Sequence, residues 1–371
     1  MNTRFFRIIF IICLYIAIGQ AYADIRFSLG EYLVDDEPYS ECFKEGKNGN
    51  IYISDKQTHF IRVFSPEGKY LYSLGGKGEG PGEFKRWRGA YDIDLKGEIC
   101  QIDFVNGNRR ITRFLPDGKL IESFPVKDPK IAGATAIFKR PNGDYIVNFW
   151  GGMILEHHSS LNYMGTTDSI SILDGKGGLK EMVHETKTFH SFSGNANGSW
   201  IEIPYLDMMV SAYSPTRDTL AFQRKTDDHV TILDLRRKKT IRIPNGFKIS
   251  PLTKQDIDCW IEERKTLSSV FNVQLKDYQK FRSNGTNFIT NKAIVDRLFF
   301  NNAGELFISH YNKIKKKYIV NKFSTGNKHL ETKSLDKIPA YIGKSRIYYM
   351  IYNENDETYT IEVKSQDRFF N

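Results

Sequence analysis

The sequence lacks the features that usually identify an enzyme or a disulfide-bonded module. It has only four cysteines in 371 residues, at positions 13, 42, 100 and 259. Four scattered cysteines do not form a disulfide framework. We expect Cys42, Cys100 and Cys259 to be free thiols, with a single disulfide as the alternative. No G-x-S-x-G segment occurs, so the usual signature of a serine hydrolase is missing.

Long apolar runs are also scarce, and the one that stands out lies at the N-terminus. Ile8–Ile18, about eleven residues, follows Arg4 and Arg7 and precedes the A-x-A segment that ends at Ala23. This run is too short to span a bilayer, and the whole pattern is typical of a secretory signal peptide. We expect cleavage after residue 23 and export of residues 24–371 to the periplasm or beyond, with no stable membrane span. An uncleaved membrane anchor, or lipidation at position 13, is the alternative.

Acidic residues are the scarcer charge, with 44 Asp and Glu against 53 Lys and Arg and a formal net charge of +9. A basic protein favours anionic partners. Export argues against nucleic acid, so we expect an anionic or glycan ligand or a partner protein. We also expect a monomer.

What the sequence does contain is a repeat. Gly49–Leu71, GNIYISDKQTHFIRVFSPEGKYL, recurs as Gly97–Leu120, GEICQIDFVNGNRRITRFLPDGKL. The copies begin 48 residues apart, which is the length of a four-stranded propeller blade. Asp55 and Asp103 end matching strands, where an Asp side chain can accept N–H groups of the next loop. We therefore predict a structural role for both aspartates.

The motifs of this repeat carry a family resemblance. Across residues 44–124 the chain reads G-x-I-Y-I-x-D, then I-x-V-F-x-x-x-G-K, then G-x-G-x-G-P-G-E-F. This series resembles the NHL repeat of six-bladed β-propellers and is similar to exported bacterial six-bladed propeller proteins of unknown function. The resemblance implies an all-β, six-bladed propeller as one domain over residues 24–371.

Strand patterns after residue 124 supply the remaining blades. The last blade runs out one strand short, whereas Ile25–Leu33 has no blade of its own. We expect this N-terminal strand to close the ring, because closure removes an exposed sheet edge. Seven blades is the alternative. Long insertions are expected at 150–168, 186–204 and 250–284. The last should be a short helical insertion, because Thr253 can cap a run of apolar residues at helical spacing.

These insertions share one face with the loops that join second to third strands and outer to next inner strands. Long loops on a rigid scaffold commonly carry binding sites. The mixture of cations and indole rings on this loop-rich face suits carboxylates, phosphates or sugars. We predict a non-catalytic ligand- or protein-binding module that uses this face. The expected ligand-binding residues are Lys85, Arg86, Trp87, Arg88, Asn108, Arg109, Trp150, Trp200 and Trp260.

The alternative prediction is a metal-dependent hydrolase or lyase, because related propellers hold a catalytic cation at the central channel. Such a site needs several inward-facing acids, amides or imidazoles. Asp92, Asp94 and Asp207 are candidates, too few to favour this hypothesis. We assign no catalytic residue and expect no cofactor, with a divalent cation in the channel retained under the alternative.

Overall fold

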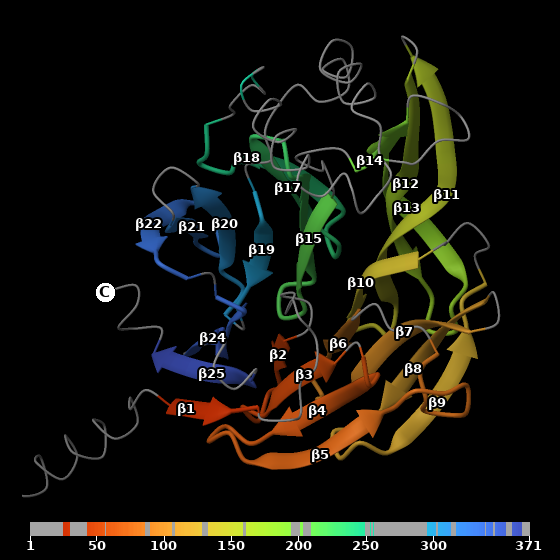
Figure 1. The fold of residues 1–371 in the computed structure, drawn as a ribbon, viewed down its shortest axis with the longest axis vertical. Helices are drawn as coiled ribbons and strands as arrows, with labels where there is room; N and C mark the ends of the chain where they lie inside the picture. The colour runs from red at the N-terminus through yellow and green to blue at the C-terminus, as the bar shows by residue number, and fades with distance from the viewer. Residues whose placement is uncertain are drawn as a thin grey trace, which may run out of the picture.

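The computed structural model describes residues 25–29, 43–55, 57–85, 90–105, 108–127, 133–158, 161–193, 201–202, 209–248, 253, 255, 295–301, 303–312, 317–337, 339–343, 346–353 and 358–365. Their strands form six antiparallel sheets, the blades of a propeller (Figure 1). In blades one to five the strand that comes first in the chain is innermost. The all-β, six-bladed prediction is confirmed.

Blades one and two follow the sequence repeat. Their strands are β2 (Phe43–Glu45), β3 (Ile51–Asp55), β4 (Phe60–Phe64) and β5 (Tyr70–Gly75), then β6 (Tyr91–Ile93), β7 (Ile99–Val105), β8 (Asn108–Phe114) and β9 (Leu120–Pro125). The matching turns before β5 and β9 end at Gly68 and Gly118, whose φ angles of 88° and 85° lie in the region that favours glycine. The two copies of the sequence repeat therefore form structurally equivalent blades.

Blade three differs from prediction. Residues 150–168, expected as a loop, lie in a long hairpin of β11 (Tyr145–His158) and β12 (Leu161–Leu173), flanked by β10 (Gly133–Lys139), β13 (Leu179–Ser193) and β14 (Ile201–Glu202). The pairing of β11 with β12 shifts between Trp150 and Met153 and then continues to His158. Gly151 and Gly152 therefore form an irregularity within a strand rather than the start of a loop.

Blades four and five each consist of four strands that are consecutive in the sequence. Blade four contains β15 (Met209–Ser214), β16 (Thr219–Arg224), β17 (His229–Asp234) and β18 (Lys239–Pro244). Blade five contains β19 (Arg297–Phe300), β20 (Leu306–Asn312), β21 (Lys317–Phe323) and β22 (His329–Leu335).

Blade six combines both ends of the described chain. β23 (Tyr341–Ile342), β24 (Arg346–Asn353) and β25 (Thr358–Ser365) are followed in the sheet by β1 (Ile25–Ser28). β1 pairs antiparallel with β25, from Ile25 opposite Val363 to Ser28 opposite Thr360. Arg26 adds two hydrogen bonds to Glu362 Oε1, from Nε at 3.1 Å and Nη2 at 2.5 Å.

The core is divided among the contacts between blades. Within the described residues a buried apolar cluster joins each blade to the next, including blade six to blade one. Between blades one and two, for example, Tyr52 and Leu74 pack with Tyr91 and Phe114. Cys100 is a buried free thiol in the next cluster, and burial raises its pKa well above the usual value.

The predicted helix over 250–284 lies outside the described residues, except for Thr253 and Gln255. Cys42 and Cys259 lie outside them as well. Among the described residues, no helix is both long enough and apolar enough to cross a membrane.

Candidate functional site

The innermost strands of all six blades surround a cavity of about 1240 Å³ on the propeller axis. Its lining extends from Lys225, in the β16–β17 connection on the loop-rich face, to Pro215 and Thr216, in the β15–β16 turn on the opposite face. The cavity therefore follows the axis between the two faces. Its size is in the range of pockets that hold small organic ligands.

One position of the inner strand supplies a ring of side chains to this cavity. It lies five residues before the turn position that the blades share, which is Gly49 in blade one. In blades one to five the occupants are Lys44, Asp92, Phe138, Tyr213 and Phe299, and all five line the cavity. In blade six the neighbouring residue Tyr341 does so. We call these six residues the inner ring.

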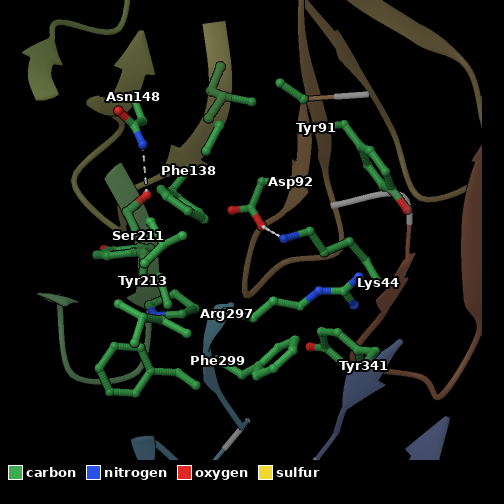
Figure 2. A pocket seen from close by; sticks show the side chains of 18 of the residues that line it. Lys44, Tyr91, Asp92, Phe138, Asn148, Ser211, Tyr213, Arg297, Phe299 and Tyr341 are labelled. Atoms are coloured by element: carbon green, nitrogen blue, oxygen red, sulfur yellow. Dashed lines mark hydrogen bonds and ion pairs between the residues drawn. The ribbon is translucent and has the colours of Figure 1, made fainter. Parts of the chain in front are cut away.

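The inner ring has two chemically different sides. Blades one and two contribute a cation and an acid, whereas blades three to six contribute aromatic rings (Figure 2). The rings of Phe138 and Tyr213 lie 5.8 Å apart between centroids, and the ring of Tyr341 stacks on Phe43 at 5.9 Å. The Tyr213 hydroxyl donates to Asp218 Oδ1 at 2.7 Å. The aromatic side is thus held by packing and by a buried hydrogen bond.

The charged side is held more loosely. Lys44 Nζ lies 3.8 Å from Asp92 Oδ1, which is beyond hydrogen-bond distance, and 5.6 Å from the centroid of Phe138 (Figure 2). An ammonium group has three N–H donors. Among the described residues, none accepts a hydrogen bond from this ammonium. Lys44 therefore offers hydrogen-bonding capacity to the cavity.

Asp92 is a buried acid with one firm partner. Its Oδ2 accepts the backbone N–H of Lys139, from blade three, at 3.3 Å. Burial raises the pKa of Asp92 to about 6, and the nearby charge of Lys44 opposes that rise. Asp92 therefore changes charge close to neutral pH.

The other acidic candidate from the sequence is part of the framework. Asp94 Oδ1 accepts the backbone N–H groups of Lys96 and Glu98 at 2.8 and 2.9 Å, and Oδ2 pairs with Lys139 Nζ at 2.8 Å. Asp207 lies outside the described residues. Within the part of the chain that the structure describes, no three His, Cys, Asp or Glu side chains are grouped to hold a metal ion.

Nearer the loop-rich face, the next layer of inner-strand positions carries mostly small side chains. Two residues before the inner ring stand Ala90, Ala136 and Ser211, and in blade five Arg297. Arg297 extends toward the space between Lys44 and Phe299 (Figure 2), and its Nη1 donates to the carbonyl of Pro339 at 3.4 Å. Because three of these four side chains are small, space above the inner ring is left open.

The glycine-rich segment 75–84 connects blades one and two. Gly75 has a φ of 91°, and a Cβ there would lie 2.2 Å from the ring of Phe84. His59 Nδ1 donates to the Phe84 carbonyl at 2.7 Å, and Arg110 Nη1 donates to the Glu79 and Gly80 carbonyls at 3.3 Å. The segment thus turns carbonyl oxygens toward a cation, which is the opposite of an anion cradle.

The predicted ligand-binding residues that the structure describes lie on different elements, and none of them lines the axial cavity. Lys85 donates its backbone N–H to Asp103 Oδ2 at 3.2 Å, and its Nζ pairs with Glu79. Asn108 and Arg109 begin β8, and burial lowers the pKa of Arg109. Trp150 lies in blade three, where a Cβ on Gly133 would come within 2.6 Å of its indole. Arg86, Trp87, Arg88, Trp200 and Trp260 lie outside the described residues.

The sequence prediction missed most of the cavity lining, including Lys44, Phe138, Phe299 and Arg297. A signal for the inner ring was present, because its first five members stand at one fixed distance from the turn position of each blade. Residue type changes from blade to blade at this position, so a comparison of residue types did not reveal it.

Solved structures that are similar to this chain have low sequence identity and TM-scores below 0.5. A protein described as exported, from Bacteroides fragilis, is 11% identical with a TM-score of 0.49, covering 93% of this chain and 94% of its own. A member of the DUF4221 family from Bacteroides vulgatus is 10% identical with a TM-score of 0.48, covering 92% and 97%. Virginiamycin B lyase from Staphylococcus aureus, in complex with quinupristin, is 11% identical with a TM-score of 0.43, covering 92% and 99%.

No curated protein matches the chain. The model of the family DUF5128, described as a 6-bladed beta-propeller, matches residues 45–244, more than half of the sequence. This chain therefore belongs to the DUF5128 family of six-bladed β-propellers.

Proposed function

We propose that this protein is an exported, non-catalytic binding propeller that takes up a small organic ligand in its axial cavity from the loop-rich face. The observation that carries the proposal is the cavity of about 1240 Å³, lined by inner strands of all six blades and containing both aromatic and charged side chains. Pockets for small ligands commonly combine apolar walls with a few polar groups.

The direction of entry follows from the layers of the inner strands. The layer of Ala90, Ala136 and Ser211 lies closer to the loop-rich face than the inner ring does, because inner strands run from that face toward the turn. A ligand that enters there passes small side chains before it reaches Lys44 and Phe138. Lys85 and Arg109, on loops and strand ends of the same face, would border the entrance.

Export is the second part of the proposal. The basic, apolar and A-x-A segments of residues 1–23 support a cleaved leader. The pairing of β1 with β25 supports ring closure by a strand that begins just after the predicted cleavage site. N-terminal sequencing of the protein recovered from the periplasm or medium should start at Asp24.

The test of binding uses residues 24–371 purified from the exported fraction and incubated with a metabolite extract. Co-purifying small molecules are identified by mass spectrometry. Ala136→Trp should abolish their recovery, because the indole would fill the open layer above the inner ring. Leu330→Trp, on the outer strand β22 where Leu330 is half exposed, is the matched control and should leave recovery unchanged.

A protein partner is the other occupant that this experiment can detect. If protein rather than a small molecule is retained, and deletion of residues 250–284 but not Ala136→Trp prevents retention, the cavity is not the binding site. Equal recovery of small molecules by both tryptophan variants would also contradict the proposal.

A further inference from the structure

The chemistry of the inner ring and of Arg297 indicates what kind of ligand fits the cavity, an inference that rests on the proposed binding function. The ring is divided into a charged arc in blades one and two and an aromatic arc in blades three to six. A ligand that contacts both arcs at once must have a charged end and an apolar body.

Three acids of the lining accept hydrogen bonds from the protein, whereas Glu45 Oε2 is buried without a hydrogen-bond partner among the described residues. Asp94 binds Lys139 and two backbone N–H groups, and Asp296 Oδ2 accepts the Tyr311 N–H at 2.5 Å. Asp92 accepts a backbone N–H, and when it is ionised above its pKa of about 6 its charge is offset by Lys44, whose Nζ lies 3.8 Å from Oδ1. Burial also raises the pKa of Glu45. The negative charge of the lining is therefore offset or reduced.

Lys44 keeps donors available to the cavity. The Lys44 ammonium makes no hydrogen bond to any described residue, although it lies between Asp92 and the ring of Phe138. In the next layer, Arg297 brings a planar guanidinium from blade five toward the same space (Figure 2). A guanidinium can bind both oxygens of a carboxylate through parallel N–H donors. Two cations from different blades thus approach one region.

The aromatic arc completes the site. Phe138, Tyr213 and Phe299 are nearly buried, at 7%, 6% and 7% exposure, and present ring surface to the cavity. Aromatic rings pack favourably against other rings in offset or edge-on arrangements. An aromatic or alicyclic body therefore matches this side better than a sugar or a peptide backbone, which would leave polar groups facing apolar walls.

We propose that the axial cavity binds an aromatic organic anion whose carboxylate contacts Lys44 and Arg297 and whose ring system packs against Phe138, Tyr213 and Phe299. The ligand would reach these residues from the loop-rich face, and its carboxylate would fill hydrogen-bonding capacity of Lys44 that the protein itself does not use.

Isothermal titration of residues 24–371 with three matched probes tests the proposal: 2-naphthylacetate, its neutral amide and 2-(2-naphthyl)ethylamine. We expect the carboxylate to bind at least tenfold more tightly than either analogue. Lys44→Met and Arg297→Gln should each weaken carboxylate binding about tenfold, since each removes a charge-assisted hydrogen bond. Lys69→Met, on the exposed turn of blade one, should have no effect.

The variants also separate the two arcs. Phe138→Leu should weaken the binding of all three probes to a similar degree. Arg297→Lys keeps the positive charge but lacks the paired N–H donors of a guanidinium, so its affinity for the carboxylate should lie between those of the wild type and Arg297→Gln. Circular dichroism and thermal unfolding establish whether each variant is folded. If Arg297→Gln does not fold, Arg297→Lys still tests the role of the guanidinium.

Several results would overturn the proposal. Equal binding of the amide would refute the requirement for an anion, and carboxylate binding insensitive to both Lys44→Met and Arg297→Gln would refute the assigned site. Absence of binding by all three probes, or recovery of a neutral or cationic molecule from the extract, would refute the ligand class. The binding function is judged separately, because recovery of any small molecule that Ala136→Trp prevents would support the axial site alone.

Discussion

Blades one and two carry two kinds of polar residue at equivalent positions, and their surroundings differ. Asp55 and Asp103, at the ends of the second strands, are the same residue in both blades and are surrounded by partners. Lys44 and Asp92, on the inner strands, differ in type and lie 3.8 Å apart at the wall of a cavity. The polar residues that are identical in both blades, Asp55 and Asp103, bind other residues of the blades. The polar residues that differ between the blades, Lys44 and Asp92, face the cavity.

The contacts of the framework residues are numerous. Asp55 Oδ1 accepts the N–H groups of Gln57 and Thr58 at 2.9 and 3.3 Å, and Oδ2 accepts the Thr58 hydroxyl at 2.6 Å. Arg62 lies 3.6 Å from the same carboxylate. In blade two, Arg110 lies directly opposite Asp103 in the pairing of β7 with β8 and donates to it from Nε and Nη2 at 3.3 and 3.2 Å. Asp55 therefore connects its loop to the next strand, and Asp103 connects β8 to the segment that contains Lys85.

The largest effect should come from removing such a framework acid. Asp55→Ala should lower the free energy of unfolding by roughly 4 kcal/mol, because it strands buried donors and the charge of Arg62. Urea unfolding followed by tryptophan fluorescence measures the loss. Asp117→Ala, in the exposed turn of blade two, is the control and should cost less than about 1 kcal/mol. Equal costs would break the distinction between framework and surface acids.

Removing the charge of the inner-ring acid Asp92 should stabilise the protein, whereas removing a framework acid destabilises it. Because burial raises the pKa of Asp92 from 3.8 to about 6, the folded protein binds its proton more tightly than the unfolded chain does. This group's contribution to stability is therefore greatest below pH 4 and declines as pH rises through 6. Asp92→Asn should stabilise the protein at pH 8 by at most about 3 kcal/mol, and the gain should vanish near pH 4.

Unfolding curves of wild type and Asp92→Asn at several pH values between 4 and 8 test this expectation. Lys44, Asp94 and Lys139 also face this region, so Asp94→Asn serves as the comparison. Asp94→Asn should destabilise at pH 8, because it breaks the pair with Lys139. A pH-independent difference for Asp92→Asn would show that this carboxylate is ionised throughout.

The sequence predicted those parts of the fold in which local patterns decide the structure. Strand patterns after residue 124 predicted the remaining blades, because alternation and turn residues act locally. The structural role of Asp55 was also predictable, because an Asp before a loop meets the N–H groups of the next residues. Asp103 has a structural role as well, but its backbone donor is Lys85, from the preceding connection.

Two features escaped prediction for physical reasons. In blade three, residues 150–168 were predicted as a loop, yet cross-strand pairing on both sides of Gly151 and Gly152 continues the hairpin through them. In the cavity, the inner ring is formed by residues that are far apart in the sequence and of different types, from Lys44 to Phe299. Only closure of the ring of blades brings such residues together, so no local pattern reports their contact.

The smallest effect should come from the cation of the inner ring. Lys44→Met should change the free energy of unfolding by less than about 1 kcal/mol at pH 5, because the ammonium makes no hydrogen bond to the described residues and Asp92 is then mostly protonated. At pH 8 the cost should grow, since Asp92 is ionised and loses its neighbouring cation. Arg62→Met is the matched variant, because it removes a framework cation that lies over the ring of Phe60 at 5.3 Å and near Asp55, and it should cost about 2 kcal/mol at both pH values. If Lys44→Met lowers the free energy of unfolding as much as Arg62→Met does at pH 5, Lys44 belongs to the framework. The distinction between framework and cavity residues would then be wrong for Lys44, the residue on which the proposed ligand binding most depends.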